Sequence, residues 1–288
     1  MSRPKDILKR LHPFALSVVD ATATVTSPLR MRPDFLIVGG QRCGTTSLFK
    51  TLAQHPAVAR PFALKGVHYF DMHYDKSPAW YRGHFPISVT SHLKRLGRPG
   101  PLTGESSPFY GFHPLAAERI AADLPDIKLL MLLRDPVERA YSAHSHERAR
   151  GFETEPFERA IELEEERTSG ERERMAADPG YVSFDLQHHA YMARGRYIEQ
   201  IEHLERAVGP GRLHVIDSNE FFTDPERTFA GVLDFLGLEP YPKTVFERHN
   251  ARDRNPMDPQ MRARLLARFD ESDARLAQWW GRSLPWRP

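Results

Sequence analysis

At residues 35–49 the chain reads Phe35-Leu-Ile-Val-Gly-Gly-Gln-Arg-Cys-Gly-Thr-Thr-Ser-Leu-Phe49. This pattern predicts a short apolar strand, a glycine-rich turn and the first turns of a helix. Gly39, Gly40 and Gly44 permit a tight loop whose backbone N–H groups face inward, and Arg42 adds a positive charge within it. Because free N–H groups and the helix dipole both attract negative charge, the stretch predicts an anion site.

The spacing of this loop is that of a Walker A phosphate-binding loop, with one difference. Gly39, Gly44 and Thr46 match its fixed positions, but Thr45 stands where the lysine that reaches the nucleotide phosphates belongs. A nucleotide kinase would lack its main electrostatic contact here. The kinase therefore remains an alternative, and a loop that holds a different phosphorylated nucleotide is favoured.

Composition sets the class of protein. A length of 288 residues suits one large α/β domain or two small ones, and contents of 40% hydrophobic and 27% charged residues are ordinary for a soluble globular protein. The 40 basic and 38 acidic residues leave a net charge of +2, which argues against a nucleic-acid-binding protein. Cys43 is the one cysteine, so no intrachain disulfide forms. No apolar run is long enough to span a bilayer, and a cytoplasmic location is expected.

Residues 1–30 are predicted to be a helical N-terminal extension that precedes one domain at 31–288. Lys5, Lys9 and Arg10 flank Ile7, Leu8 and Leu11, which describes a short basic amphipathic helix. Packing on the back of the domain is favoured over weak contact with a membrane surface, which remains the alternative.

Apolar runs and helical patterns alternate along the rest of the chain. The expected core is a parallel sheet covered by helices on both faces, the three-layer α/β/α arrangement of P-loop proteins in a single domain. Residues 128–133 form the clearest buried strand. Further strands are expected at 58–61 and 212–216, and a strand end with a turn at 103–110. Helices are expected at 46–54, 113–123, 137–150, 184–208, 225–236 and 260–280.

Two segments each leave two interpretations open. The aromatic-rich segment 67–86 is either a core-packing region or a wall of a substrate site. The charge-dense segment 151–180 is either a solvated helix and loop with weak ion pairs or a mobile flap over a cleft.

A second anion site is predicted where the strand at 128–133 ends. Arg134 follows the strand, Pro136 suits the first turn of the next helix, and Ser142 lies two turns along it. Ligands of open α/β sheets bind at this edge, so Arg134 and Ser142 are placed to hold a phosphate. A structural ion pair of Arg134 with a carboxylate is the alternative.

Together the two elements resemble those of the 3′-phosphoadenosine 5′-phosphosulfate (PAPS)-dependent sulfotransferases. The resemblance rests on Gly40-Gln-Arg-Cys-Gly-Thr-Thr-Ser47 and on Arg134-Asp-Pro-Val-Glu-Arg-Ala-Tyr-Ser142. It implies that the first element holds the 5′-phosphosulfate and that Arg134 and Ser142 hold the 3′-phosphate. It further implies nucleotide contacts from Tyr197, Asn250 and Arg252. No metal is expected, because the histidines are scattered and no Cys/His ligand spacing appears. The cofactor-binding set is Gly40, Gln41, Arg42, Cys43, Gly44, Thr45, Thr46, Ser47, Arg134, Ser142, Tyr197, Asn250 and Arg252.

The stretch Val67-His-Tyr-Phe-Asp71 is similar to the heparan-sulfate-type and bacterial carbohydrate branch. This implies a hydroxyl of a glycan or glycolipid as acceptor; a small metabolite or lipid, or a non-catalytic nucleotide-binding protein, are the alternatives. Two positions depart from that branch. Arg42 replaces the usual loop lysine and keeps the charge without being able to give up a proton. Gly66 replaces the glutamate that serves as base.

Arg42, His68 and Glu105 are the predicted catalytic residues. Arg42 is expected to stabilise charge on the departing oxygen. His68 is the first choice of general base and Glu105 the second, because a reference pKa near 6.5 suits a base at neutral pH. A packing or orienting role is the alternative for His68.

Overall fold

The computed structural model describes residues 24–61, 65–88, 100–247, 249 and 256–287. Within them, five strands form one parallel sheet with the order β2-β3-β1-β4-β5. The strands are β1 (Phe35–Gly39), β2 (Val58–Ala59), β3 (Leu102–Ser106), β4 (Lys128–Leu133) and β5 (Leu213–Asp217). β1 and Leu129–Leu133 of β4 are buried throughout, as the continuous apolar runs require for a sheet covered on both faces.

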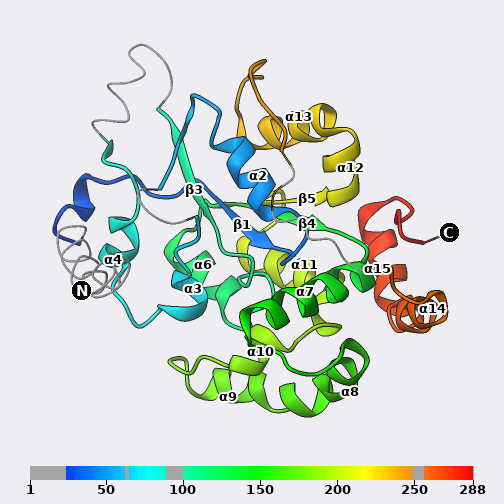
Figure 1. The fold of residues 1–288 in the computed structure, drawn as a ribbon. Coiled ribbons are helices and arrows are strands. Elements are labelled where there is room, and N and C mark those ends of the chain that lie inside the picture. Colours follow the sequence, from blue (N-terminus) through cyan, green and yellow to red (C-terminus); the bar gives the residue numbers. More distant parts are fainter. Residues whose placement is uncertain (1–23, 62–64, 89–99, 248, 250–255, 288) are drawn as a thin grey trace, which may run out of the picture.

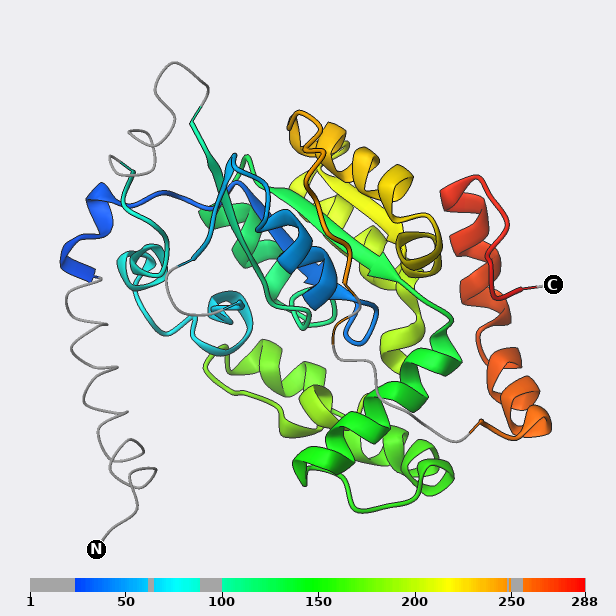
Figure 2. The same cartoon turned by 45° about the horizontal axis from the view of Figure 1, so that its top comes forward.

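Helices cover both faces of this sheet (Figure 1). Helix α2 (Thr45–Leu52) lies on one face, and α6 (Ala116–Asp123) and α11 (Tyr197–Val208) pack together on the other, as both ribbon views show (Figures 1 and 2). The predicted three-layer α/β/α fold is confirmed. Further helices are α3 (Tyr69–Met72), α4 (Pro78–Gly83), α7 (Pro136–Arg150), α12 (Ser218–Thr223), α13 (Pro225–Leu236), α14 (Pro259–Ala267) and α15 (Asp270–Trp280), with 3₁₀ turns at Ser27–Leu29 and Ala193–Gly195.

The strand order explains where ligands bind. The chain leaves β1 to form β2 and β3 on one side, and then β4 and β5 on the other. In such sheets the crevice lies beyond the carboxyl end of the strand at which the order reverses. This is the end of β1, where the glycine-rich loop begins.

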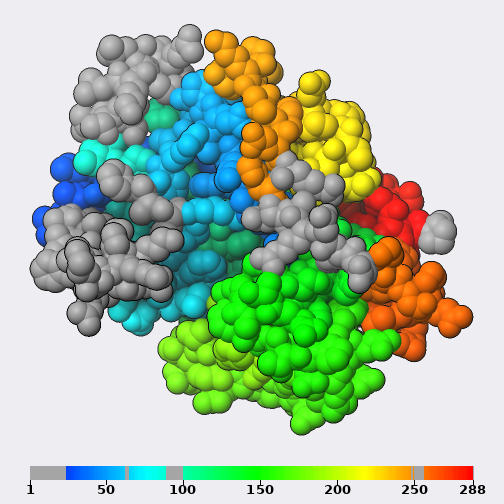
Figure 3. Space-filling view, in the orientation of Figure 1, coloured from blue at the N-terminus to red at the C-terminus, as the bar shows by residue number. Residues whose placement is uncertain are grey.

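The charged segment 151–180 folds into α8 (Phe157–Thr168) and α9 (Glu171–Ala177), which with α10 (Phe184–His188) form a helical lobe beside the sheet (Figures 2 and 3). Two of its carboxylates are buried rather than solvated. Glu153 accepts a hydrogen bond from Arg167 at 2.8 Å, and Glu164 accepts from the backbone N–H groups of Met192 and Ala193 at 2.6 and 2.8 Å. The segment is thus a folded structural unit, and its charges hold neighbouring backbone in place.

Two long helices predicted from the sequence are wrong. The helix expected at 184–208 is broken into α10, a 3₁₀ turn and α11. Glu164 takes the N–H groups of residues 192 and 193, while the Arg194 guanidinium donates to the carbonyls of Leu186 and Gln187 at 2.7 and 2.8 Å. The side chain of Glu164 from α8 and that of Arg194 from within the segment thus satisfy backbone groups that a continuous helix would pair.

The helix expected at 260–280 divides at Arg268–Phe269 into α14 and α15. The Phe269 side chain is 1% exposed and packs so closely on Gly195 that a Cβ there would come within 2.7 Å of the ring. Burial of this aromatic side chain accompanies the change of helix direction.

The aromatic segment 67–86 belongs to the core. The rings of Tyr69 and Tyr81 stack with centroids 4.6 Å apart, and Phe70 and Phe85 are fully buried. The core-packing interpretation is therefore the one that the structure supports for these rings. None of the described helices is long and apolar enough to cross a membrane.

Candidate active site

A cavity of about 860 Å³ opens at the carboxyl end of the sheet, where the sheet order predicts a crevice. Its volume lies within the range of about 300–1,000 Å³ that is usual for small-molecule sites. Several predicted residues line it: Gln41, Arg42, Gly44, Thr45, Thr46, His68, Arg134 and Ser142. Both predicted anion sites therefore face one space.

The glycine-rich loop adopts a backbone that depends on its sequence. Gly44 has φ 98° and precedes α2 as its N-cap, and Arg42 has φ 71°. This left-handed conformation is easy for glycine and uncommon for arginine. It turns the Arg42 side chain toward α7, where its Nε donates to Ser142 Oγ at 3.1 Å. A direct hydrogen bond thus joins the two predicted anion sites.

Lys65 supplies the ammonium that the loop sequence lacks. It lies in the connection from β2 to α3, and its Nζ donates to Thr46 Oγ1 at 3.0 Å and Thr45 Oγ1 at 3.3 Å. Burial lowers the pKa of Lys65 to about 8, although the charge of Glu105 acts in the opposite direction. Lys65 was not predicted from the sequence, because it lies 20 positions after Thr45 of the loop. The one local indication of its role is that it directly precedes Gly66-Val67-His68.

His68 faces the cavity and is paired with a buried carboxylate. Its Nδ1 lies 2.9 Å from Oδ2 of Asp71, and Asp71 is 3% exposed. Burial alone lowers the pKa of His68, but the hydrogen bond and charge of Asp71, with the charge of Glu105, outweigh it and the pKa is raised. The arrangement orients the imidazole and leaves its other nitrogen for a ligand.

Glu105 lies behind the cavity wall. It is fully buried at the end of β3 and does not line the cavity. Its carboxylate accepts hydrogen bonds from Tyr110 Oη at 2.7 Å, Ser107 Oγ at 2.7 Å, Tyr81 Oη at 3.1 Å and the Val67 N–H at 2.6 Å. Burial raises the pKa of Glu105 despite these donors. The carboxylate holds the segment that presents Lys65 and His68.

Gly66 is required by close packing against β3. A Cβ at this position would lie 2.5 Å from the Ser106 carbonyl oxygen and 2.8 Å from Ser107 Oγ. The Lys65 carbonyl accepts the Ser106 N–H at 2.9 Å, so the segment runs directly beside the strand. A glutamate at position 66 therefore needs a shift of backbone that this sheet edge resists.

We expect Gly66→Ala to lower the free energy of unfolding by about 1–3 kcal/mol, because the added methyl meets backbone rather than a flexible side chain. Urea unfolding followed by circular dichroism measures this. Gly180→Ala is the matched control, since a Cβ there meets only Asp178 Oδ1, at 3.4 Å. Equal unfolding midpoints for the two variants would contradict the packing argument.

The second anion site follows β4. Asp135 caps α7 by accepting the N–H groups of Val137 and Glu138 at 2.9 and 3.2 Å, and it is also bonded to Arg262. Arg134 lines the cavity, with an Nη2 to Glu138 Oε2 distance of 3.5 Å. Asp135 is thus engaged in capping, and no cluster of metal-ligating side chains occurs in the described part of the chain.

Other predicted site residues lie outside the cavity wall. Gly40, Cys43 and Ser47 are buried and do not line the cavity, and Ser47 Oγ accepts the His249 N–H at 2.9 Å. Tyr197 is 1% exposed and donates to the Arg134 carbonyl at 2.9 Å, which supports the second anion site from behind. Asn250 and Arg252 lie outside the described residues, as do residues 1–23 of the predicted extension.

The structure also brings residues to the cavity that sequence reasoning did not find. Besides Lys65, these include Phe109, His146, Arg150, Gln187, His188, Arg194, Phe222, His249, Arg262 and Trp286. Arg194 is held by the Gln41 side chain at 2.8 Å, and burial lowers the pKa of Arg194 to about 9. These residues come from separate parts of the chain, including α7, α10, α12, α14 and the loops around Phe109, His249 and Trp286, so no local pattern in the sequence groups them.

Comparison with known proteins agrees with this geometry. The sulfotransferase domain family model matches residues 32–251, so the chain belongs to the sulfotransferase family, whose enzymes use PAPS. Among solved structures, a sulfotransferase from Alicyclobacillus acidocaldarius is 30% identical, with a TM-score of 0.66 and coverage of 90% of this chain and 100% of that one.

Curated relatives include the membrane-associated sulfotransferase kil1 of Dictyostelium discoideum, 24% identical over 91% of this chain and 68% of that protein. Another is human heparan sulfate glucosamine 3-O-sulfotransferase 3B1, 29% identical over 75% of this chain. The chain spans 48% of the length of this human relative.

Proposed function

We propose that this protein transfers the sulfuryl group of PAPS to a hydroxyl of a carbohydrate or glycolipid and releases adenosine 3′,5′-bisphosphate. The observation that carries the proposal is the Arg42–Ser142 hydrogen bond, which joins a phosphosulfate loop and a 3′-phosphate site in one cavity. The names of the heparan sulfate relatives support a carbohydrate acceptor.

In the proposed reaction, the acceptor oxygen attacks sulfur as the bond between sulfur and the bridging phosphate oxygen breaks. His68 takes the acceptor proton. Arg42 stabilises the charge that grows on the bridging oxygen, and Lys65, with a pKa of about 8, stabilises that charge and is able to supply a proton to it. Lys65 thereby fills the role for which arginine is unsuited.

Geometry favours His68 over Glu105 as the base. His68 lines the cavity, whereas all four donors around Glu105 belong to the protein and the carboxylate has no cavity surface. We assign Glu105 the positioning of residues 65–68.

The nucleotide assignment is tested by calorimetry. Wild-type protein is expected to bind adenosine 3′,5′-bisphosphate at least about tenfold more tightly than 5′-AMP, and Arg134→Ala to remove that preference, because a charge-assisted hydrogen bond contributes about 1.5–3 kcal/mol. Arg206→Ala, at an exposed position of α11 outside the cavity, is the control. Equal affinity of wild-type protein for the two nucleotides would refute the proposal.

Transfer of labelled sulfonate from PAPS to any glycan, glycolipid or phenol would exclude the non-catalytic alternative. Because the chain belongs to the sulfotransferase family, we set aside the alternative that it is a nucleotide kinase. The cytoplasmic location and membrane-surface contact by residues 1–30 stay predictions; flotation of the full chain with liposomes tests the latter.

A further inference from the structure

One buried arginine joins the glycine-rich loop to the helical lobe. Arg194 lies in the 3₁₀ turn between α10 and α11 and is 5% exposed, yet it forms part of the cavity wall. Its Nη2 donates to the carbonyls of Leu186 and Gln187 in α10 at 2.7 and 2.8 Å. Its Nη1 donates to Gln41 Oε1 of the loop at 2.8 Å. A single planar guanidinium thus holds the end of α10 and a loop side chain at the same time.

Aromatic rings and the backbone fix the place of this guanidinium. Its central carbon lies 4.7 Å from the centre of the Phe109 ring and 5.2 Å from that of the Phe112 ring. The Arg194 carbonyl accepts a hydrogen bond from Gln200 Nε2 at 2.9 Å, which anchors the turn to α11. Contacts on several sides therefore keep the guanidinium in one orientation.

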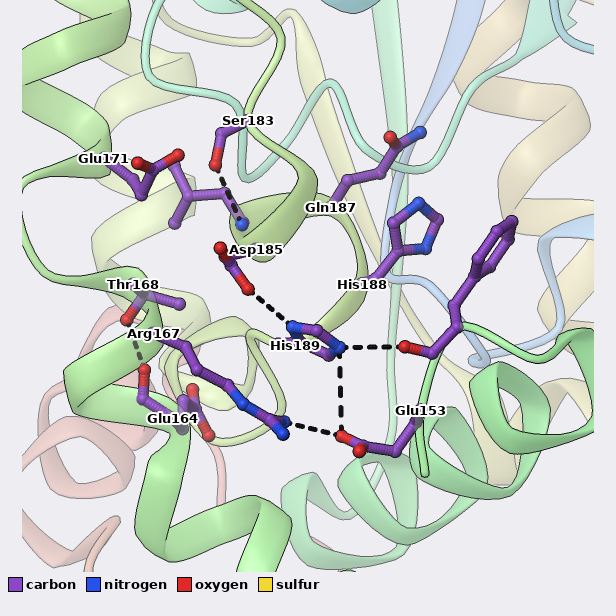
Figure 4. A network of polar contacts seen from close by, with 12 residues as sticks. Glu153, Glu164, Arg167, Thr168, Glu171, Ser183, Asp185, Gln187, His188 and His189 are labelled. Atoms are coloured by element: carbon purple, nitrogen blue, oxygen red, sulfur yellow. Dashed lines mark hydrogen bonds and ion pairs between the residues drawn. The ribbon is translucent and has the colours of Figure 1, made fainter. Parts of the chain in front are cut away.

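The lobe gives Arg194 a rigid base. Figure 4 shows the polar contacts that join α8 to α10: Arg167 of α8 donates to Glu153 at 2.8 Å. His189 Nε2 lies 4.0 Å from Glu153 Oε2, and its Nδ1 lies 2.6 Å from Asp185 Oδ1 of α10 (Figure 4). A further carboxylate of α8 accepts the two backbone N–H groups just before Arg194. The turn is thus bonded to both helices of the lobe.

The contact with Arg194 determines how the Gln41 amide is oriented. A guanidinium has N–H donors and no acceptor, so the amide atom that it bonds is the oxygen. The Gln41 NH₂ group is then left as a donor, and within the described part of the chain no group accepts a hydrogen bond from it. Gln41 lines the cavity and directly precedes Arg42. Its side chain therefore offers a ligand an N–H donor.

Arg194 also links the loop to the proposed base. The Gln187 side chain, at the end of α10, contacts α3, the helix that carries Asp71. Asp71 in turn orients His68. Gln41 and His68 both line the cavity, and in the proposed reaction the sulfuryl group has to lie between the loop and the base. The Gln41 amide is therefore at the part of the loop where a sulfonate is expected.

We propose that Arg194 is a positioning residue for sulfuryl transfer, which fixes the Gln41 amide so that its NH₂ group donates to the sulfonate of bound PAPS. This inference rests on the proposed function and adds a pair of residues to its donor site. Sulfonate oxygens only accept hydrogen bonds, so the opposite orientation of the amide would bring oxygens together. Adenosine 3′,5′-bisphosphate lacks the sulfonate, so the contact is specific to the donor and absent from the product.

The test is calorimetric titration of full-length protein with PAPS and with adenosine 3′,5′-bisphosphate, without acceptor. Gln41→Met keeps the length of the side chain and removes the NH₂ group. It is expected to lower the affinity for PAPS about tenfold, as for one hydrogen bond to a charged group, and to leave the affinity for the bisphosphate unchanged. Gln278→Met, exposed on α15 and outside the cavity wall, is the control.

Arg194→Lys tests the positioning step. An ammonium lacks the planar geometry that holds two carbonyls and the amide at once, so the affinity for PAPS is expected to fall about three- to fivefold, with unchanged affinity for the bisphosphate. Because Arg194 acts through Gln41, adding Arg194→Lys to Gln41→Met should cause no further loss. Arg196→Lys, exposed two residues further on and outside the cavity wall, is the matched control.

The proposal is refuted if Gln41→Met binds PAPS as tightly as Gln278→Met, or if Arg194→Lys matches Arg196→Lys. Losses that multiply in the double variant would show that Arg194 acts independently of Gln41 and would also refute it. Equal losses for both nucleotides would assign the residues to stability of the fold and overturn the proposal as well. These results leave the donor assignment standing, whereas equal affinity of wild-type protein for the bisphosphate and 5′-AMP would refute the proposed function instead.

Discussion

Replacing Lys65 by methionine is expected to lower kcat/KM for PAPS by about 10²–10³, the loss typical of one preorganised charge donor at a developing oxyanion. Lys65 bonds both threonine hydroxyls of the glycine-rich loop, so its ammonium lies at the position to which the transferred group is assigned. Initial rates with labelled PAPS, with a carbohydrate or phenol acceptor found by screening, measure the effect.

The titration of Lys65 is also expected to set the basic limb of the pH profile of kcat/KM for PAPS. Its pKa is about 8 in the free protein, and the proposed role needs the protonated form, so kcat/KM for PAPS falls as pH rises through about 8. Lys65→Arg keeps the charge at higher pH and should move this limb upward while restoring part of the rate. Lys76→Met is the control, because Lys76 pairs with Asp75 at the surface and lies outside the cavity. A Lys65→Met variant as active as that control would rule out the role.

His68→Ala is expected to lower kcat by about 10²–10⁴, which is the contribution of a general base. The contact with Asp71 raises the pKa of His68, and the base acts when deprotonated, so activity rises with pH through that raised pKa. Asp71→Asn removes the charge, lowers the pKa and should shift the acidic limb of the kcat profile to lower pH. A shifted limb distinguishes a base from a residue that only packs.

Glu105→Gln separates the two candidate bases. Four donors surround the buried carboxylate, so the amide leaves some of them mispaired and stability is expected to fall by about 1–3 kcal/mol. In the folded fraction, kcat should fall less than in His68→Ala. Wild-type turnover of His68→Ala together with a loss of about 10² or more in a folded Glu105→Gln would reverse the assignment.

The sequence was sufficient to predict a strand or a helix end where the residues of one short segment determine the local structure. The strand at Lys128–Leu133 is a continuous apolar run, and it has the predicted bounds. Helix α13 ends at Leu236 with Gly237 at φ 75°, as its sequence indicates. The same kind of reasoning failed for 184–208, where the Glu164 carboxylate and the Arg194 guanidinium take backbone groups that periodicity assigns to a helix.

Local sequence patterns were enough to predict the parallel α/β fold, the glycine-rich loop and the arginine–serine element, because each depends on residues a few positions apart. Which groups share the cavity depends instead on contacts between distant segments. Lys65 reaches a loop 20 residues away, Glu105 is turned inward by four donors, and Arg150 and His188 meet on Glu147 from separate helices. Contacts between distant segments follow from the packing of the sheet and its helices, and no local pattern in the chain encodes them.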